Sequence, residues 1–293
     1  MQRSEPVSVW PLSGPLLEGP VWVQRDAALW FTDIKRHKIY RYDPVSGDKR
    51  EWLAPDQIGF ALPAAGGGFI AGLKTGLHRF DETNGSFTPL CDPEPELPNN
   101  RLNDGIVDVH GRLWFGTMDD GEANATGRIY RLGADGSCVA ESDFCSITNG
   151  PALSPDGRTL YHTDTLGGFI YACDVGDDGT LSNRRLFATI PNADGFPDGP
   201  AVDAEGCVWT GLYKGWSVRR YSPAGELLET VRLPVDAITK IAFGGPDLKT
   251  VYVSTANKHL SPAELEAQPL AGNLFTFDVD VPGVAGVEIS VGV

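Results

Sequence analysis

Four short motifs place a carboxylate or carboxamide side chain directly before a glycine. They are Glu18-Gly19-Pro20, Asn103-Asp104-Gly105, Asn149-Gly150-Pro151 and Asp198-Gly199-Pro200. Carboxylate and amide oxygens are hard ligands that suit Ca²⁺, Mg²⁺ or Mn²⁺. Carboxylates that converge in a buried place are costly without a cation. If the fold brings these motifs together, they predict a site for one divalent metal ion.

The four motifs also share their position relative to an aromatic residue. Glu18, Asn103, Asn149 and Asp198 each lie 11 or 12 residues before one of Trp30, Trp114, Tyr161 and Trp209. A single Asn-Gly or Asp-Gly pair is more typical of a turn than of a ligand. The common spacing in four repeats favours a site, because equivalent positions of repeats in a closed ring lie at equal height.

The aromatic residues mark an internal repeat of about 45 residues. Short strands bounded by Gly, Pro, Asp and Asn run through the whole chain. Six of them carry an aromatic anchor, namely Trp30, Phe69, Trp114, Tyr161, Trp209 and Tyr252. Another strand follows each anchor, and a four-stranded unit repeated six times predicts a β-propeller. A β-sandwich, the alternative fold, does not explain six equal repeats.

We therefore expect residues 1–293 to form one all-β domain, a six-bladed propeller with four antiparallel strands in each blade. The strand predicted at residues 7–12 is left over at the N-terminus and supplies the outer strand of the last blade, which closes the ring. One helix is predicted at residues 261–268, where Ser261 is the N-cap and Pro262 the first helical residue.

Composition excludes several classes of partner. The net charge is −15, with 39 acidic against 24 basic residues, which disfavours nucleic acid and anionic membranes. No run of 18 apolar residues predicts a membrane helix. Residues 1–10 lack a basic segment followed by an apolar one, so we expect a cytoplasmic protein.

The five cysteines do not suggest a disulfide framework or a zinc ribbon. Their number is odd and no Cys-x-x-Cys pair occurs among Cys91, Cys138, Cys145, Cys173 and Cys207. We expect them to be small buried apolar residues in a reducing compartment.

The motifs resemble those of the regucalcin/gluconolactonase family of sugar lactonases. The similarity runs from Glu18-Gly19-Pro20 to residues 269–275, nearly the whole chain, and is most specific in residues 100–105 and 116–118. It implies a metal-dependent hydrolase that opens an aldonolactone, such as glucono-, xylono- or arabinonolactone, to the aldonic acid.

The resemblance also implies roles for individual residues. Glu18, Asn149 and Asp198 would hold one divalent ion, which is Ca, Mg, Mn, Zn or Fe. Arg101 and Asn103 would hold the substrate, and Asp198 would also be the general base.

One position departs from the family pattern. An acidic residue often stands three positions after the methionine of Gly-Thr-Met, whereas this chain has Gly121, with Asp119, Asp120 and Glu122 around it. The sequence therefore leaves the identity of the aldonolactone open.

The sequence is also compatible with other functions. A propeller that binds calcium or a partner without catalysis is the main alternative, and hydrolysis of a phosphotriester or aryl lactone is another. The Gly-x-Ser-x-Gly motif of serine esterases does not occur in the sequence, which argues against that class of enzyme. His162 lies near the predicted site but is more typical of a structural histidine. Tyr213 and Trp216 are candidates for an apolar wall or for packing between blades.

Overall fold

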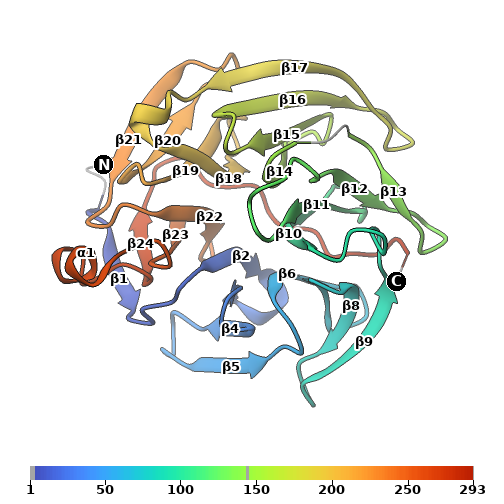
Figure 1. Cartoon of the computed structure of the whole chain (residues 1–293), viewed down its shortest axis with the longest axis horizontal. Coiled ribbons are helices and arrows are strands. Elements are labelled where there is room, and N and C mark those ends of the chain that lie inside the picture. The colour runs from blue at the N-terminus through green and yellow to red at the C-terminus, as the bar shows by residue number, and fades with distance from the viewer. Residues whose placement is uncertain (1–3, 143–144, 293) are drawn as a thin grey trace.

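The computed structural model describes residues 4–142 and 145–292, which form a ring of β-sheets around a central channel (Figure 1). Over these residues four sheets are separate four-stranded antiparallel units. One parallel bridge, between Gly199 and Lys240, joins the other two units into a sheet of eight strands. The predicted six-bladed all-β propeller is confirmed.

Each blade contributes one strand to each of four concentric positions. The innermost strands are β2 (Leu17–Val23), β6 (Ile58–Pro63), β10 (Asn100–Val107), β14 (Thr148–Leu153), β18 (Phe196–Val202) and β22 (Ile238–Gly244). The second strands are β3 (Ala28–Asp33), β7 (Phe69–Leu73), β11 (Leu113–Asp119), β15 (Thr159–Asp164), β19 (Val208–Tyr213) and β23 (Thr250–Thr255). The third strands are β4 (Lys38–Tyr42), β8 (Gly76–Asp81), β12 (Ile129–Leu132), β16 (Phe169–Val175), β20 (Ser217–Tyr221) and β24 (Leu274–Asp278). The outermost strands are β5 (Lys49–Leu53), β9 (Ser86–Cys91), β13 (Cys138–Ala140), β17 (Leu181–Thr189), β21 (Leu227–Arg232) and β1 (Val7–Trp10).

The two ends of the chain meet in the sixth blade. Strand β1 pairs antiparallel with β24, so the N-terminal strand completes the blade as predicted. Helix α1 (Pro262–Ala267) begins after Ser261, whose hydroxyl accepts from the backbone N–H of Glu264 while the Glu264 carboxylate accepts from the N–H of Ser261. This capping box confirms the predicted helix start. No helix among the described residues is long and apolar enough to cross a membrane.

The six aromatic anchors are buried in the core, where they pack between strands of the blades. Three of them also fix the turn that precedes their strand, because the indole N–H donates to an aspartate of that turn. The pairs are Trp30 with Asp26 at 2.9 Å, Trp114 with Asp108 at 3.0 Å and Trp209 with Asp203 at 2.9 Å. The repeated turn-and-aromatic pattern in the sequence is therefore a repeated hydrogen bond in the fold.

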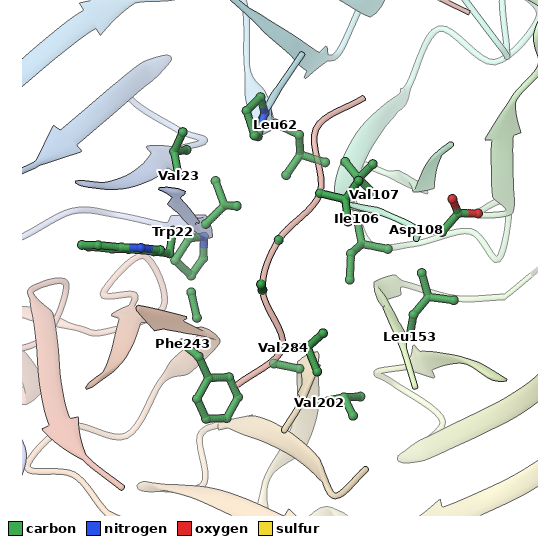
Figure 2. Close-up of a pocket in the computed structure, with 18 of the residues that line it drawn as sticks. Trp22, Val23, Leu62, Ile106, Val107, Asp108, Leu153, Val202, Phe243 and Val284 are labelled. Atoms are coloured by element: carbon green, nitrogen blue, oxygen red, sulfur yellow. The ribbon is translucent and has the colours of Figure 1, made fainter. Parts of the chain in front are cut away.

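The C-terminal segment, residues 279–292, crosses the end of the channel at which the innermost strands finish. Val284 lies there beside Phe243, and both line a cavity of about 190 Å³ together with Trp22 and Ile106 (Figure 2). Ile289 forms a parallel bridge with Ala64, which holds the segment against the second blade. The site residues lie toward the opposite end, where the same strands begin.

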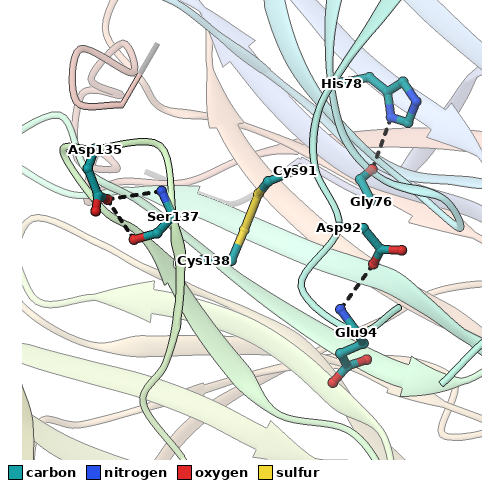
Figure 3. The surroundings of a disulfide bond; sticks show 8 residues. All are labelled: Gly76, His78, Cys91, Asp92, Glu94, Asp135, Ser137 and Cys138. Atoms are coloured by element: carbon teal, nitrogen blue, oxygen red, sulfur yellow. Dashed lines mark hydrogen bonds between the residues drawn. A yellow bond between two sulfur atoms is a disulfide. The ribbon is translucent and has the colours of Figure 1, made fainter. Parts of the chain in front are cut away.

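The expectation for the cysteines is wrong for two of the five. Cys91 on β9 and Cys138 on β13 form a disulfide that joins the outermost strands of the second and third blades (Figure 3). Cys91 is the last residue of β9 and Cys138 the first residue of β13, so the bond joins opposite ends of two neighbouring outer strands. The other three, Cys145, Cys173 and Cys207, are free and buried as expected.

Removing a buried turn aspartate should cost much more stability than removing an exposed one. Asp108 accepts hydrogen bonds from Arg112 and from the indole of Trp114. Asp108→Ala leaves both donors buried without this acceptor, so we expect a loss of about 3–5 kcal/mol of stability. Asp156 lies in the corresponding turn of the fourth blade but is exposed, and Asp156→Ala should cost about 1 kcal/mol or less. Thermal unfolding of both variants measures the difference, and equal losses would contradict this account.

Candidate active site

Every innermost strand is irregular at the height of the predicted site. The pairing with the second strand slips at Glu18/Val21, Ile58/Phe60, Leu102/Asp104, Asn149/Ala152, Pro197/Pro200 and Ile238/Lys240. Such bulges redirect side chains from the normal alternation of a strand. At two of them the glycine is required, because Gly19 and Gly150 have φ of 54° and 83°, in the left-handed region.

Threonines of the second strands satisfy carbonyl groups at these bulges. Thr32 donates to the carbonyls of Glu18 at 3.2 Å and Gly59 at 3.1 Å, and so bridges the first and second blades. Thr163 of the fourth blade and Thr210 of the fifth both donate to the carbonyl of Asp198, at 3.3 and 3.0 Å. These hydroxyls fix neighbouring blades to one another at the site.

The structure brings all five predicted site residues to one cavity of about 250 Å³. Glu18, Arg101, Asn103, Asn149 and Asp198 line it, and each side chain is largely buried. They come from β2, β10, β14 and β18, the innermost strands of four blades. The remaining wall is formed by Leu16, Met118, Glu122, Ile147, Thr165, Leu166, Phe196, Tyr213, Lys214 and Lys258.

A chain of hydrogen bonds orients the two amides. Arg101 donates from Nη1 to Oδ1 of Asn103 at 2.6 Å. Asn103 donates from Nδ2 to Oδ1 of Asn149 at 2.8 Å and to the carbonyl of Thr148 at 2.6 Å. Asn149 in turn donates to the hydroxyl of Thr165 at 2.8 Å. The amide oxygen of Asn149 is thereby held on the side of Asn103.

The two carboxylates are held alike. One oxygen of Glu18 accepts the backbone N–H of Gly19 at 3.0 Å, and one oxygen of Asp198 accepts that of Gly199 at 2.8 Å. The second oxygen of each accepts no hydrogen bond from a described residue. Burial, and then the charge of Asp104, raises the pKa of Glu18 to about 7. Burial, and then the charges of Glu18 and Asp104, raises the pKa of Asp198 well above its ordinary value.

Lys240 is a site neighbour that the sequence interpretation missed. Its ammonium group forms an ion pair with Asp104, and both side chains are buried. Lys240 lies 12 residues before Tyr252, the same spacing that connects Glu18 with Trp30. The spacing is thus visible in the sequence, but a lysine is not an oxygen ligand and does not by itself indicate a metal site.

The acidic residues around Gly121 have three different environments. Asp119 accepts backbone N–H groups of its own turn, from Gly121 at 3.3 Å and Ala123 at 3.1 Å. Asp120 accepts from Arg101 Nε at 3.0 Å and Lys35 at 2.7 Å. Although burial opposes it, hydrogen bonds from Lys35 and Gln57 keep the pKa of Asp120 well below its usual range. Glu122 alone of the three lines the cavity, where it pairs with Lys258 at 2.6 Å.

Of the aromatic and histidine candidates, only some line the cavity. Tyr213 lines the cavity, whereas Trp216 lies on the exposed part of the same loop. His162 is buried outside this cavity, with its ring centroid 5.4 Å from that of Tyr171. Burial lowers the pKa of His162 to about 4. His162 thus lies outside the candidate site, but neither of its ring nitrogens has a hydrogen-bond partner among the described residues, as a satisfied structural histidine would have.

The set of possible metal ligands is small. Within residues 4–142 and 145–292, no group of three or more His, Cys, Asp or Glu side chains is placed to hold a metal ion. The candidate set instead combines two carboxylates, Glu18 and Asp198, with the amide oxygen of Asn149. Its donors are all oxygens, which is the chemistry that hard divalent cations prefer.

Similarity to known proteins extends over most of the chain. It is 34% identical over 269 residues to 6-deoxy-6-sulfogluconolactonase of Pseudomonas putida, covering 92% of each chain. It is 35% identical over 272 residues to L-arabinolactonase of Azospirillum brasilense, covering 92% of this chain and 90% of that one. The structure of a calcium-binding protein, regucalcin, from Agrobacterium tumefaciens superposes with a TM-score of 0.93 at 26% identity, covering 99% and 98% of the two chains.

A family model spans the site and most of the blades. Residues 16–257 match the SMP-30/Gluconolactonase/LRE-like region. The matched segment contains all five candidate residues, from Glu18 to Asp198. This chain belongs to the SMP-30/gluconolactonase family, whose members include sugar lactonases and regucalcins.

Proposed function

We propose that the protein is a metal-dependent lactonase that opens an aldonolactone to its aldonic acid. The observation that carries the proposal is the pair of buried carboxylates, Glu18 and Asp198, each of which has one oxygen that accepts no hydrogen bond from the residues that the structure describes. They line one cavity together with the amide oxygen of Asn149 and the guanidinium group of Arg101. Relatives named for lactonase activity on sulfogluconolactone and arabinolactone support the same class of reaction.

The residues fit a divalent cation. Burial, and then repulsion from neighbouring carboxylates, makes the charged forms of Glu18 and Asp198 unfavourable and raises the pKa of each. A cation between the free oxygens would remove that penalty and complete a set of three oxygen ligands with Asn149. The chemistry of the donors allows Ca, Mg, Mn, Zn or Fe, and the regucalcin structure of A. tumefaciens is described as calcium-binding.

The proposed reaction uses a Lewis acid and a general base. A bound ion would supply a Lewis acid for the lactone carbonyl. Asp198 would face the ion with one oxygen and take a proton from water with the other, because the oxygen that accepts from Gly199 keeps a second lone pair, and the water oxygen bonds to the carbonyl carbon. The ring C–O bond then breaks, and Asp198 returns the proton to the leaving oxygen, which becomes the hydroxyl group of the aldonic acid.

Substrate recognition falls to charged groups around the cavity. Arg101 is fixed by Asp120 and Asn103, and it presents the rest of its guanidinium group to a hydroxyl or ring oxygen. Asn103 uses both amide hydrogens inside the protein, so it offers substrate only its oxygen. Glu122 and Lys258 supply an acceptor and a donor for sugar hydroxyls, and Glu122 takes the place of the acidic residue that position 121 lacks.

A propeller that only binds calcium or a partner remains the alternative function. Leu166 and Phe196 give the cavity an apolar side, which could contact the ring of an aryl lactone, so hydrolysis of such a lactone is a second alternative. The cytoplasmic location stays a prediction from the sequence.

Activity against a panel of lactones tests the proposed function. A pH-stat assay should detect acid release from glucono-, xylono- or arabinonolactone, and a chelator should abolish it because the Lewis acid is lost. Added Mn²⁺ or Ca²⁺ should restore it. If the protein opens no aldonolactone with any ion, the binding function is favoured. Hydrolysis of an aryl lactone or phosphotriester alone would reassign the substrate.

Glu18 predicts a pH dependence of stability for the metal-free protein. Its pKa is about 7 in the folded state and 4.5 ordinarily. Between these values the folded state keeps a proton that the unfolded state has lost, so Glu18 contributes less stability as the pH rises. Glu18→Gln removes this loss, and its stability relative to the parent should rise by roughly 1–3 kcal/mol from pH 4.5 to 7. Thermal unfolding of both proteins in the presence of a chelator measures this change in relative stability. If the difference in stability between Glu18→Gln and the parent does not change with pH, the raised pKa of Glu18 is contradicted.

Two substitutions separate catalysis from binding. Asp198→Asn keeps an oxygen ligand and removes the base, so turnover with saturating metal should fall roughly 10²–10⁴-fold. Arg101→Ala leaves the three ligands in place, so metal affinity should persist while kcat/KM falls. Asp194→Asn, the same change on the surface four residues away, is the control and should hydrolyse at the parent rate. Parent-like turnover by metal-saturated Asp198→Asn would exclude Asp198 as the base.

A further inference from the structure

The buried ion pair between Lys240 and Asp104 spans the channel. Lys240 lies on β22 in the sixth blade and Asp104 on β10 in the third. These two blades face each other across a ring of six, as Figure 1 shows for the two strands. Both side chains are at least nine-tenths buried. A charged pair in this place has no evident purpose in packing, because apolar residues of similar volume are usually at least as stabilising.

The pair contacts the backbone of two of the three candidate ligand motifs. Asp104 accepts from the N–H of Gly150 at 2.9 Å, and Gly150 directly follows Asn149. The lysine side chain passes over Gly199, which directly follows Asp198. A Cβ at Gly199 would lie only 2.8 Å from Cγ of Lys240. The absence of a side chain at position 199 is therefore what lets the lysine reach Asp104.

The charges of this pair act on the candidate ligands with opposite signs. The Asp104 carboxylate lies beside the glycines of both motifs, because it accepts from Gly150 and a Cβ at Gly199 would lie 3.1 Å from its Oδ2. The ammonium group of Lys240 pairs with Asp104 and so offsets the negative charge next to these motifs. Without the lysine, three carboxylates of like charge would converge on one buried place.

We propose that Lys240 is a positioning residue of the metal site: it neutralises Asp104 and holds that carboxylate away from the ion, which is then bound by two carboxylates instead of three. The inference rests on the proposed function only for the existence of the metal site. An ion held by fewer anionic ligands binds less tightly and remains a stronger Lewis acid, which suits a catalytic site better than a storage site.

Metal affinity tests this proposal, because the variants are expected to change the affinity in opposite directions. Ca²⁺ and Mn²⁺ are titrated calorimetrically into chelator-treated protein. Lys240→Met removes the cation with little change of shape, so affinity should rise at least about tenfold. Asp104→Asn leaves the lysine without its partner charge, so affinity should fall by a similar factor. The double variant Asp104→Asn/Lys240→Met is uncharged at both positions, and its affinity should return to within about threefold of the parent value.

The double variant also guards against simple misfolding, because it leaves no unpaired charge buried. Arg112→Met is the matched control, since it breaks another buried ion pair, with Asp108, on the turn between β10 and β11. It should lower stability and leave metal affinity unchanged. If Lys240→Met weakens metal binding or leaves it unchanged while the parent binds normally, Lys240 is merely structural and the inference is overturned. A parent protein that binds neither ion overturns the proposed metal site itself, and the inference with it.

Discussion

Buried carboxylates of like charge converge at the channel axis, and much of the surrounding structure serves to hold them there against their repulsion. Glu18 and Asp198 come from the first and fifth blades, and Asp104 from the third. Each is fixed by the N–H of the glycine that follows it. Only a closed ring can press three such groups together, because no single blade would tolerate the cost.

The closure of the ring depends on features remote from the axis. Strand β1 completes the sixth blade, and the turn aspartates bind the indole groups of the anchors. Threonine hydroxyls then bridge neighbouring blades at the height of the bulges. These contacts fix the distances between groups at the centre, as the site that we propose for an ion and a substrate requires.

The fold could be predicted from the sequence because it follows from one period. A repeat of about 45 residues determines the blades, and equal spacing before the anchors places Glu18, Asn103, Asn149 and Asp198 at one height. Arg101, and the role of each of the five residues, came instead from the resemblance to the lactonase family. Contacts between different blades could not be read in this way. The partners Lys240 and Asp104 are 136 residues apart, and their pairing depends on the ring geometry. The Cys91–Cys138 bond was missed for the same reason, because it also joins two different blades.

The position of a bound ion tests the central claim most directly. Crystals soaked in Mn²⁺ can be measured near the manganese absorption edge, where the ion gives an anomalous signal and protein oxygens do not. The account predicts one strong peak on the channel axis, within about 2.0–2.6 Å of oxygens from Glu18, Asn149 and Asp198. The same soak of Glu18→Gln should give a much weaker peak. A peak elsewhere, or none on the axis at saturating Mn²⁺, would contradict it.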